Sequence, residues 1–126
     1  MLASIWCTLV LILYFYEASK AGKGIGTQGL SDLVNKESGV ILDVRDKSEY
    51  DQGHIIDAKN IPFREVDDRL SELNAFQSKP VIVVCKFGQQ STGVTKKLKS
   101  KGFTQVFKLS GGMSEWIAAS LPLIKS

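Results

Sequence analysis

The chain opens with a run of uncharged, mostly apolar residues. Residues 2–16, LASIWCTLVLILYFY, contain no charged side chain, whereas acidic and basic residues are spread through the rest of the chain. A helix built from this run has no polar face to expose to water. The pattern therefore predicts an N-terminal transmembrane anchor over residues 1–17, in contact with the membrane through residues 2–16. A helix buried inside the domain is the alternative interpretation.

The charges that flank this run predict its orientation. Lys20 and Lys23 follow the run and no basic residue precedes it, so the positive-inside rule places the rest of the chain in the cytoplasm. The run also lacks the basic start and the small-residue cleavage site of a signal peptide. We therefore expect a single-pass protein of the inner (cytoplasmic) membrane, with a flexible linker rich in Gly, Ala and Lys over residues 18–27.

Hydrophobic residues after the linker alternate between helix and strand spacing. The VIVV run at residues 81–84 is the strongest strand signal, because four consecutive β-branched residues are typical of a strand buried on both faces of a parallel sheet. The alternation predicts one α/β domain over residues 28–126 with a mostly parallel sheet. We expect helices over residues 28–36, 70–76, 90–101 and 114–119, and strands over residues 40–42, 81–84 and 106–109.

Composition narrows the function classes. The 126 residues carry 16 Lys and Arg against 13 Asp and Glu, a net charge of +3 that is too small and too dispersed to indicate nucleic-acid binding. The lysines of residues 90–101 are interpreted as a solvated helix face. Two cysteines, Cys7 in the apolar run and the distant Cys85, do not make a disulfide framework, so Cys85 is interpreted as a reduced thiol.

Cys85 occupies a position where α/β domains place their chemistry. It directly follows the strand at residues 81–84 and precedes a loop that leads into a helix, and ligand sites lie at the carboxyl ends of parallel strands. Backbone N–H groups of the loop and the positive end of the helix dipole would stabilise a thiolate there. Gly88 allows the loop to curl. A buried, inert cysteine that closes a core strand is the alternative.

Six short segments occur in a fixed order along the domain. A single GHI or GG means little, but six segments in register are specific. They are VILDVR (residues 40–45), EYDQGHI (49–55), NIP (60–62), VIVVCKFGQQS (81–91), GF (102–103) and LSGGMSEW (109–116), with LP (121–122) after them. In this order and spacing they resemble the rhodanese family over about residues 25–124. The apolar N-terminus resembles that of the small membrane-attached rhodanese-like proteins of bacteria.

The resemblance implies a fold and a reaction. The fold is a three-layer α/β sandwich with a five-stranded, mainly parallel sheet. The implied nucleophile, Cys85, takes a sulfane sulfur from thiosulfate or a persulfide donor, becomes a persulfide, and passes the sulfur to a thiol or to cyanide. No metal ion and no organic cofactor is implied. The substrate-binding loop comprises Lys86, Phe87, Gly88, Gln89 and Gln90, whose N–H groups stabilise the anionic persulfide.

The loop sequence separates this reaction from phosphoryl chemistry. Phosphatases of this fold need an arginine six positions after the cysteine to bind phosphate. In this chain Ser91 occupies that position. We expect Ser91 to cap the following helix instead. Many active rhodanese loops also carry an arginine that receives thiosulfate, whereas Gln89 and Gln90 fill the corresponding part of this loop. With Lys86 as the only full charge, we expect weak thiosulfate turnover.

Other candidate residues are interpreted as structural support. Asp43 and Arg45 match the Asp-x-Arg of the family at a strand end, where a salt bridge would support the site. His54, the only histidine, lies in the GHI segment, which the family uses structurally. Two other functions compete with sulfur transfer: a noncatalytic adaptor of the same fold, and a thiol redox sensor. The intact cysteine, Gly88 and the full-length loop favour catalysis.

Overall fold

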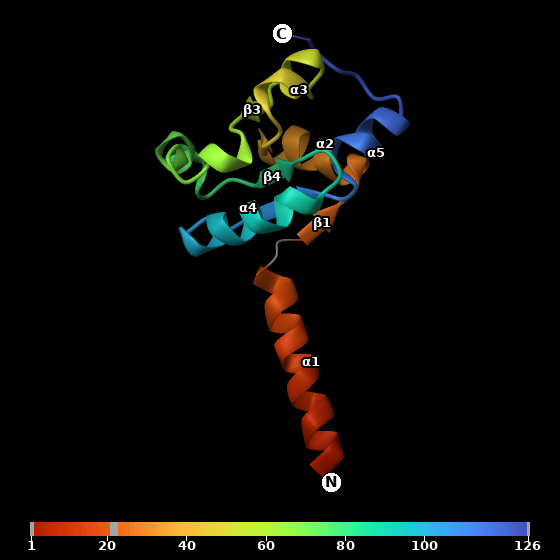
Figure 1. Ribbon diagram of the computed structural model, residues 1–126, viewed down its shortest axis with the longest axis vertical. Coiled ribbons are helices and arrows are strands. Elements are labelled where there is room, and N and C mark those ends of the chain that lie inside the picture. Colours follow the sequence, from red (N-terminus) through yellow and green to blue (C-terminus); the bar gives the residue numbers. More distant parts are fainter. Residues whose placement is uncertain (1, 21–22, 126) are drawn as a thin grey trace.

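The computed structural model describes residues 2–20 and 23–125, and the side chains of residues 4–13 and 24–125 (Figure 1). One sheet has the strand order β1-β5-β4-β2-β3, and every neighbouring pair in it is parallel. The five-stranded, parallel α/β architecture expected from the sequence is therefore confirmed. The strands are β1 (Lys23–Ile25), β2 (Val40–Asp43), β3 (Lys59–Asn60), β4 (Val81–Val84) and β5 (Val106–Leu109).

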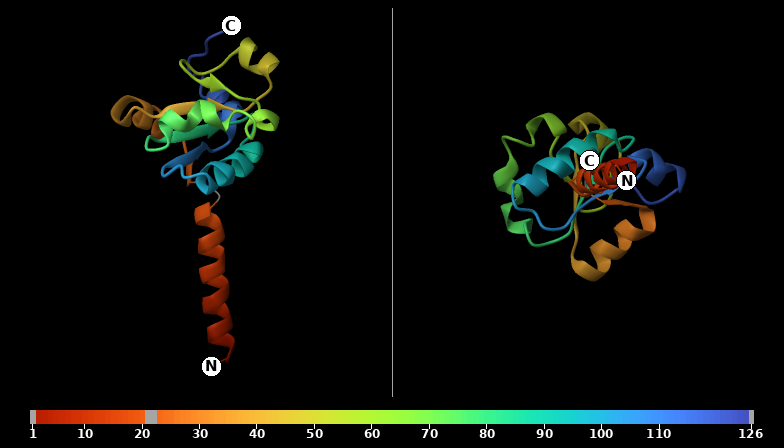
Figure 2. Two further views of the ribbon diagram at one scale, coloured as in Figure 1. Left: turned by 90° about the vertical axis from the view of Figure 1, so that its left-hand side faces the viewer. Right: turned by 90° about the horizontal axis from the view of Figure 1, so that it is seen from below.

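Helices cover both faces of this sheet. Figure 2 shows α2 and α4 on opposite sides of the strands. Two short 3-10 helices, η1 and η2, connect β3 to β4, and η2 occupies the expected helix at residues 70–76. The α-helices of the domain are α2 (Thr27–Glu37), α3 (Lys47–Gln52), α4 (Gln89–Ser100) and α5 (Gly112–Ala118), and the 3-10 helices are η1 (Phe63–Glu65) and η2 (Leu70–Phe76).

Strand β4 lies at the centre of the fold, and its four side chains divide between two cores. Val81 and Val83 pack in the cluster that includes Leu98 of α4, whereas Ile82 and Val84 pack in the cluster that includes Leu30 of α2. All four valine and isoleucine side chains are fully buried. A strand with both faces covered explains the unbroken apolar VIVV sequence.

The segment expected to be a linker contributes to the sheet. Lys23–Ile25 forms β1, whose residues pair with β5, and Thr27 begins α2. Three residues with a central glycine carry no strand signal of their own. They become a strand because the edge of β5 offers unpaired backbone groups, so the sheet begins inside the expected linker rather than after it.

The apolar N-terminal run forms a single helix, α1 (Leu2–Lys20), that projects from the domain in Figure 1. None of the helices among residues 2–20 and 23–125 is sufficiently long and apolar for a membrane span, so the predicted transmembrane helix is not supported.

Candidate active site

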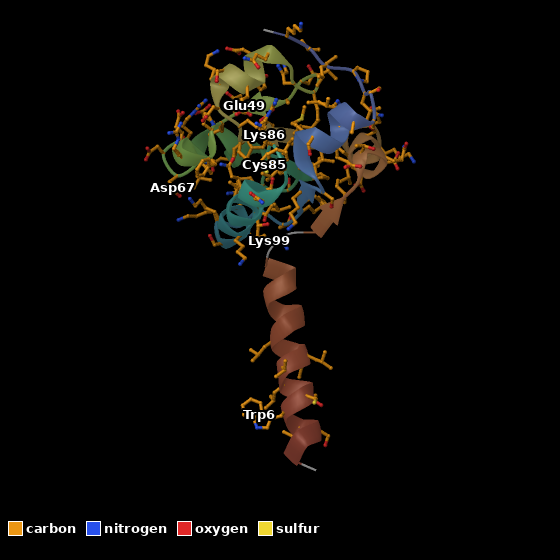
Figure 3. The ribbon with its side chains drawn as sticks, turned by 45° about the vertical axis from the view of Figure 1, so that its right-hand side comes forward. Trp6, Glu49, Asp67, Cys85, Lys86 and Lys99 are labelled. Carbon is orange, nitrogen blue, oxygen red and sulfur yellow. The ribbon has the colours of Figure 1, made fainter. Side chains whose placement is uncertain are left out.

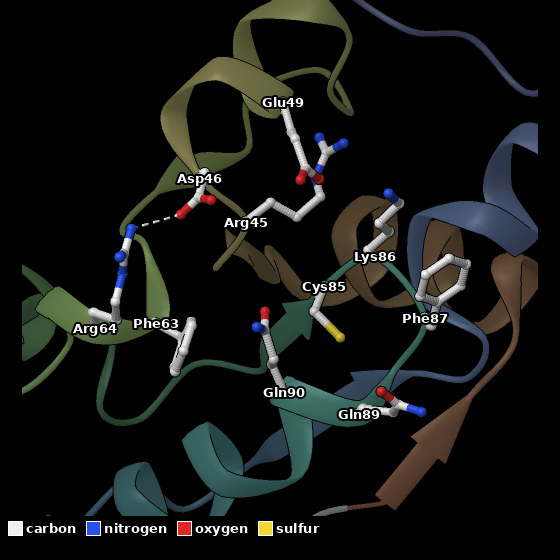
Figure 4. Close-up of a pocket in the computed structure, with 10 residues that line it drawn as sticks. All are labelled: Arg45, Asp46, Glu49, Phe63, Arg64, Cys85, Lys86, Phe87, Gln89 and Gln90. Atoms are coloured by element: carbon white, nitrogen blue, oxygen red, sulfur yellow. Dashed lines mark hydrogen bonds and ion pairs between the residues drawn. The ribbon is translucent and has the colours of Figure 1, made fainter.

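Cys85 lies directly after β4, at the carboxyl edge of the sheet and between the ends of its neighbours β2 and β5. Its side chain forms part of a cavity of about 340 Å³ (Figure 4). Only 1% of the residue is exposed, so a reagent reaches the sulfur through this cavity. The lining residues come from the ends of several elements: Arg45, Asp46, Glu49, Phe63, Arg64, Cys85, Lys86, Phe87, Gln89 and Gln90.

The loop after Cys85 turns a backbone N–H group toward the sulfur. The Gly88 N–H donates a hydrogen bond to Cys85 Sγ at 2.9 Å. Gly88 has φ 91°, in the left-handed region where a side chain is strained, and it is the N-cap of α4. Helix α4 therefore begins immediately beyond the residue that contacts the sulfur, one residue before the expected start at Gln90. An anion on Sγ lies close to this positive helix end.

Helix α5 holds the loop from its other side. The Met113 and Ser114 N–H groups donate to the carbonyl oxygens of Cys85 and Lys86, at 2.7 and 3.0 Å. In a planar trans peptide, the next N–H points opposite to the carbonyl. The N–H groups of Lys86 and Phe87 therefore point away from α5.

Gly112 makes this contact between α5 and the loop possible. It has φ 62°, and a Cβ atom at this position would overlap the carbonyl oxygen of Cys85 and lie 2.8 Å from the Gly88 nitrogen. Any side chain would push the loop away from α5. Sequence reasoning missed this role of Gly112, because α5 and the loop are separated in sequence.

Asp43 and Arg45 form the buried ion pair that their position predicted. Arg45 Nη2 lies 2.7 Å from Asp43 Oδ2, and Arg45 Nε lies 3.0 Å from Asp43 Oδ1. Arg45 Nη2 also donates to the Gly53 carbonyl oxygen at 2.7 Å. Only 7% of the Arg45 side chain and 1% of the Asp43 side chain are exposed. Arg45 lines the cavity, but its charge is compensated by Asp43.

A second arginine, which sequence reasoning missed, stands on the rim of the cavity. Arg64 belongs to η1, and its Nη2 atom lies 3.0 Å from Asp46 Oδ1. Both side chains are mostly exposed. The signal available in the sequence was a basic residue just after the NIP segment, at the carboxyl end of the short strand β3.

Lys86 is a third basic residue that lines the cavity, in addition to Arg45 and Arg64. Its Nζ atom lies 5.4 Å from the centroid of the Phe87 ring, and no ion pair found within residues 2–20 and 23–125 includes it. Figures 3 and 4 show Lys86 beside Cys85, with Glu49 across the cavity. Gln89 and Gln90 complete the polar lining from the first turn of α4.

Ser91 and His54 have structural positions. Ser91 was expected to cap α4, but the helix begins at Gln89 with Gly88 as its cap, so this expectation is wrong. The buried Ser91 hydroxyl instead points to the Val83 carbonyl oxygen at 3.5 Å. His54 Nδ1 lies 2.8 Å from the Tyr50 carbonyl oxygen, and its ring stacks on the Tyr50 ring. Neither residue lines the cavity.

Comparison with known proteins agrees with this geometry. Residues 27–119 match the family model described as a rhodanese-like domain. The chain is 33% identical over 117 residues to the uncharacterized protein YibN of Escherichia coli K12, covering 92% of this chain and 82% of YibN. It is 36% identical over 87 residues to the thiosulfate sulfurtransferase GlpE of Coxiella burnetii RSA 331, covering 69% of this chain and 79% of GlpE.

Solved structures show the same similarity. The rhodanese-like domain of the Anabaena protein Alr3790 superposes with a TM-score of 0.71 and 30% identity, covering 82% of this chain and 79% of that one. A rhodanese-related protein from Thermoplasma volcanium has the same fold, with a TM-score of 0.71 at 24% identity, covering 82% of this chain and 99% of that one. The chain belongs to the rhodanese-like domain family.

Proposed function

We propose that this protein is a sulfurtransferase that carries sulfane sulfur on Cys85. The observation that carries the proposal is the position of the Cys85 sulfur, which forms part of a cavity and accepts the Gly88 N–H at 2.9 Å. The similarity to GlpE proteins, which are named thiosulfate sulfurtransferases, supports the same reaction. The donor is thiosulfate or a persulfide, and the acceptor is a thiol or cyanide.

The proposed reaction has two displacements on sulfur. The Cys85 thiolate attacks the outer sulfur of thiosulfate, a new S–S bond forms, and sulfite leaves with the electron pair of the broken S–S bond. The acceptor then attacks the outer sulfur of the Cys85 persulfide, and the Cys85 thiolate is the leaving group. The attacking thiolate and the persulfide both carry negative charge, so the N–H groups of the loop would stabilise both.

The charges around the cavity bear on the choice of donor. Asp43 compensates Arg45, and Asp46 pairs with Arg64, so Lys86 and a shared Arg64 are the cations that face a dianionic donor. Gln89 and Gln90 supply hydrogen-bond donors but no charge. Charge-assisted hydrogen bonds are the stronger kind. We therefore propose that thiosulfate turnover is weak and that a persulfide donor is preferred.

Intact-mass measurement of the full chain tests the proposal. Incubation with thiosulfate or a persulfide donor is expected to add the mass of one sulfur atom, and cyanide is expected to remove it. The Cys85→Ser variant should gain nothing, whereas Cys7→Ser, which changes the exposed cysteine of α1, should gain the sulfur normally. A folded chain that gains no sulfur from either donor supports the adaptor. An oxidised Cys85 that forms before any persulfide supports the redox sensor.

We also propose that α1 attaches the protein to the surface of the cytoplasmic membrane. Side chains on α1 such as Ile5, Trp6 and Leu9 are at least half exposed although they are apolar, and Trp6 projects from the helix in Figure 3. Burial of such side chains in lipid is favourable. Tryptophan emission should shift to shorter wavelength when phospholipid vesicles are added, and this shift should disappear in Trp6→Phe. An unchanged emission in the unmodified chain would contradict attachment.

A further inference from the structure

A second cavity adjoins the one that contains Cys85. Its volume is about 610 Å³, and it lies between the loop after Cys85, α3, α5 and the C-terminal segment. The two cavities are adjacent, and four residues line both: Arg45, Glu49, Lys86 and Phe87. A molecule whose sulfur reaches Cys85 through the first cavity therefore lies next to residues that also line the second.

Large apolar side chains from three separate segments converge on the second cavity. Phe87 of the loop, Ile117 of α5 and Leu123 of the C-terminal segment are 58%, 54% and 40% exposed. A single exposed apolar residue is ordinary on a protein surface. Three around one concavity beside a nucleophile are typical of a site that binds an apolar group.

The C-terminal wall of this cavity is fixed in place. The Ile124 N–H donates to the His54 carbonyl oxygen at 2.8 Å, and the His54 N–H donates to the Ile124 carbonyl oxygen at 2.9 Å. Trp116 Nε1 donates to the Pro122 carbonyl oxygen at 3.0 Å. Leu123 is held between these two attachments, so the apolar wall exists before any ligand binds, and little ordering cost opposes binding.

The two cavities differ in chemistry. Charged and amide side chains dominate around Cys85, where a donor anion is received, whereas apolar side chains dominate between α5 and Leu123. Lys86 and Glu49 stand at the boundary between them. An inorganic acceptor such as cyanide has nothing to place in the second cavity, whereas an organic thiol has a carbon skeleton.

We propose that the second cavity is the acceptor subsite, which binds the apolar carbon skeleton of an organic thiol. This inference rests on the proposed sulfurtransferase function. The bound thiolate RS⁻ attacks the outer sulfur of the Cys85 persulfide and forms a new S–S bond. The bond between that sulfur and Cys85 breaks, and its electron pair returns to the Cys85 thiolate. The product is the persulfide RSS⁻, and no oxidant or reductant is consumed.

A homologous series of acceptors tests the subsite in the full chain. Persulfide-loaded protein is mixed with straight-chain thiols from ethanethiol to pentanethiol, whose intrinsic nucleophilicity is nearly equal. The rate of sulfur loss from Cys85 is followed by intact mass. Below saturation, each added methylene should raise the rate about two- to fourfold, as expected for its burial from water.

Two matched variants locate the effect. Ile117→Ser, at a half-exposed position on the cavity wall, should flatten the dependence of rate on chain length. Ile56→Ser removes a similarly exposed isoleucine that lines neither cavity, and it should leave the dependence unchanged. Circular dichroism checks that each variant is folded, and gain of sulfur during loading checks that Cys85 still reacts.

The outcomes separate this inference from the function on which it rests. Normal loading followed by a rate that does not depend on chain length would overturn the acceptor subsite alone. The same slope in Ile117→Ser as in the unmodified chain would also overturn it. Failure of Cys85 to load with any sulfur donor would instead overturn the proposed function, and the subsite with it.

Discussion

Two kinds of structure surround the reactive cysteine. The buried support consists of the Asp43–Arg45 ion pair and the contact of Gly112 with the loop, and it is shielded from water. The exposed rim consists of the Arg64–Asp46 ion pair and Lys86. The two ion pairs have similar N–O distances, 2.7 and 3.0 Å, but the arginine is 7% exposed in the first and 71% exposed in the second.

This difference in burial separates two roles. Arg45 is committed to Asp43 and to the Gly53 carbonyl oxygen, so its loss leaves a carboxylate unpaired in the interior. Arg64 is screened by water, so its loss costs the fold little and alters mainly what the cavity attracts. We therefore expect changes in the buried support to affect stability and catalysis, and changes in the exposed rim to affect donor binding.

The largest effect is expected at the buried ion pair. Replacement of Arg45→Met leaves the Asp43 carboxylate without its partner and should lower the free energy of unfolding by about 3–5 kcal/mol. Urea denaturation followed by circular dichroism measures this loss. The double variant Asp43→Asn with Arg45→Met should recover part of it, because no buried charge remains. Equal loss in the single and double variants would show that shape, not charge, makes the pair important.

The next largest effect is expected where α5 meets the loop. In Gly112→Ala the new methyl group overlaps the Cys85 carbonyl oxygen, so the loop N–H groups move from the sulfur. Loss of such donors costs about 100-fold or more in rate. Single-turnover persulfide formation measures this decrease. Gly93→Ala is the matched control, since a Cβ atom at this exposed position of α4 has nothing within 4 Å. A normal rate in Gly112→Ala would contradict the role of α5.

A smaller effect is expected on the exposed rim. Arg64→Met should change the free energy of unfolding by less than about 1 kcal/mol, yet raise the KM for thiosulfate about fivefold. Steady-state kinetics at low ionic strength measures the change, and added salt should reduce the difference between the two proteins.

The partner of Arg64 provides an opposite control. Asp46→Asn frees the guanidinium from its ion pair and should lower the KM for thiosulfate about twofold. If Arg64→Met lowered the free energy of unfolding by several kcal/mol, the exposed rim would affect stability as the buried support does, and the proposed difference between them would be contradicted.

The sequence predicted those features that depend on neighbours along the chain. The VIVV run identified β4, and Cys85 at its end identified the reactive position, because burial on both faces leaves a continuous apolar pattern. The position of Gly88 before a helix was recognisable for the same reason. These elements carry their own local signals of spacing and residue type.

Features that depend on distant segments were missed, and two expectations from the local sequence did not hold. Strand β1 exists because β5 offers an edge, and the role of Gly112 exists because α5 packs on the loop. Arg64 lines the cavity because η1 lies beside Asp46, which is distant in sequence. The expected Ser91 cap was wrong because Gly88 already ends the loop. The expected spanning helix is not supported, because no helix among residues 2–20 and 23–125 is both long and apolar enough for a span.

The central place of β4 in the sheet determines how readily local unfolding reaches it. The strand order puts two strands on either side of β4, and the outermost ones, β1 and β3, have only three and two residues. Local opening begins at such short edges and reaches the middle of a sheet last. Backbone amides around the nucleophile should therefore exchange with deuterium among the slowest in the chain. Local opening at the sheet edges then leaves the position of the reactive sulfur unchanged.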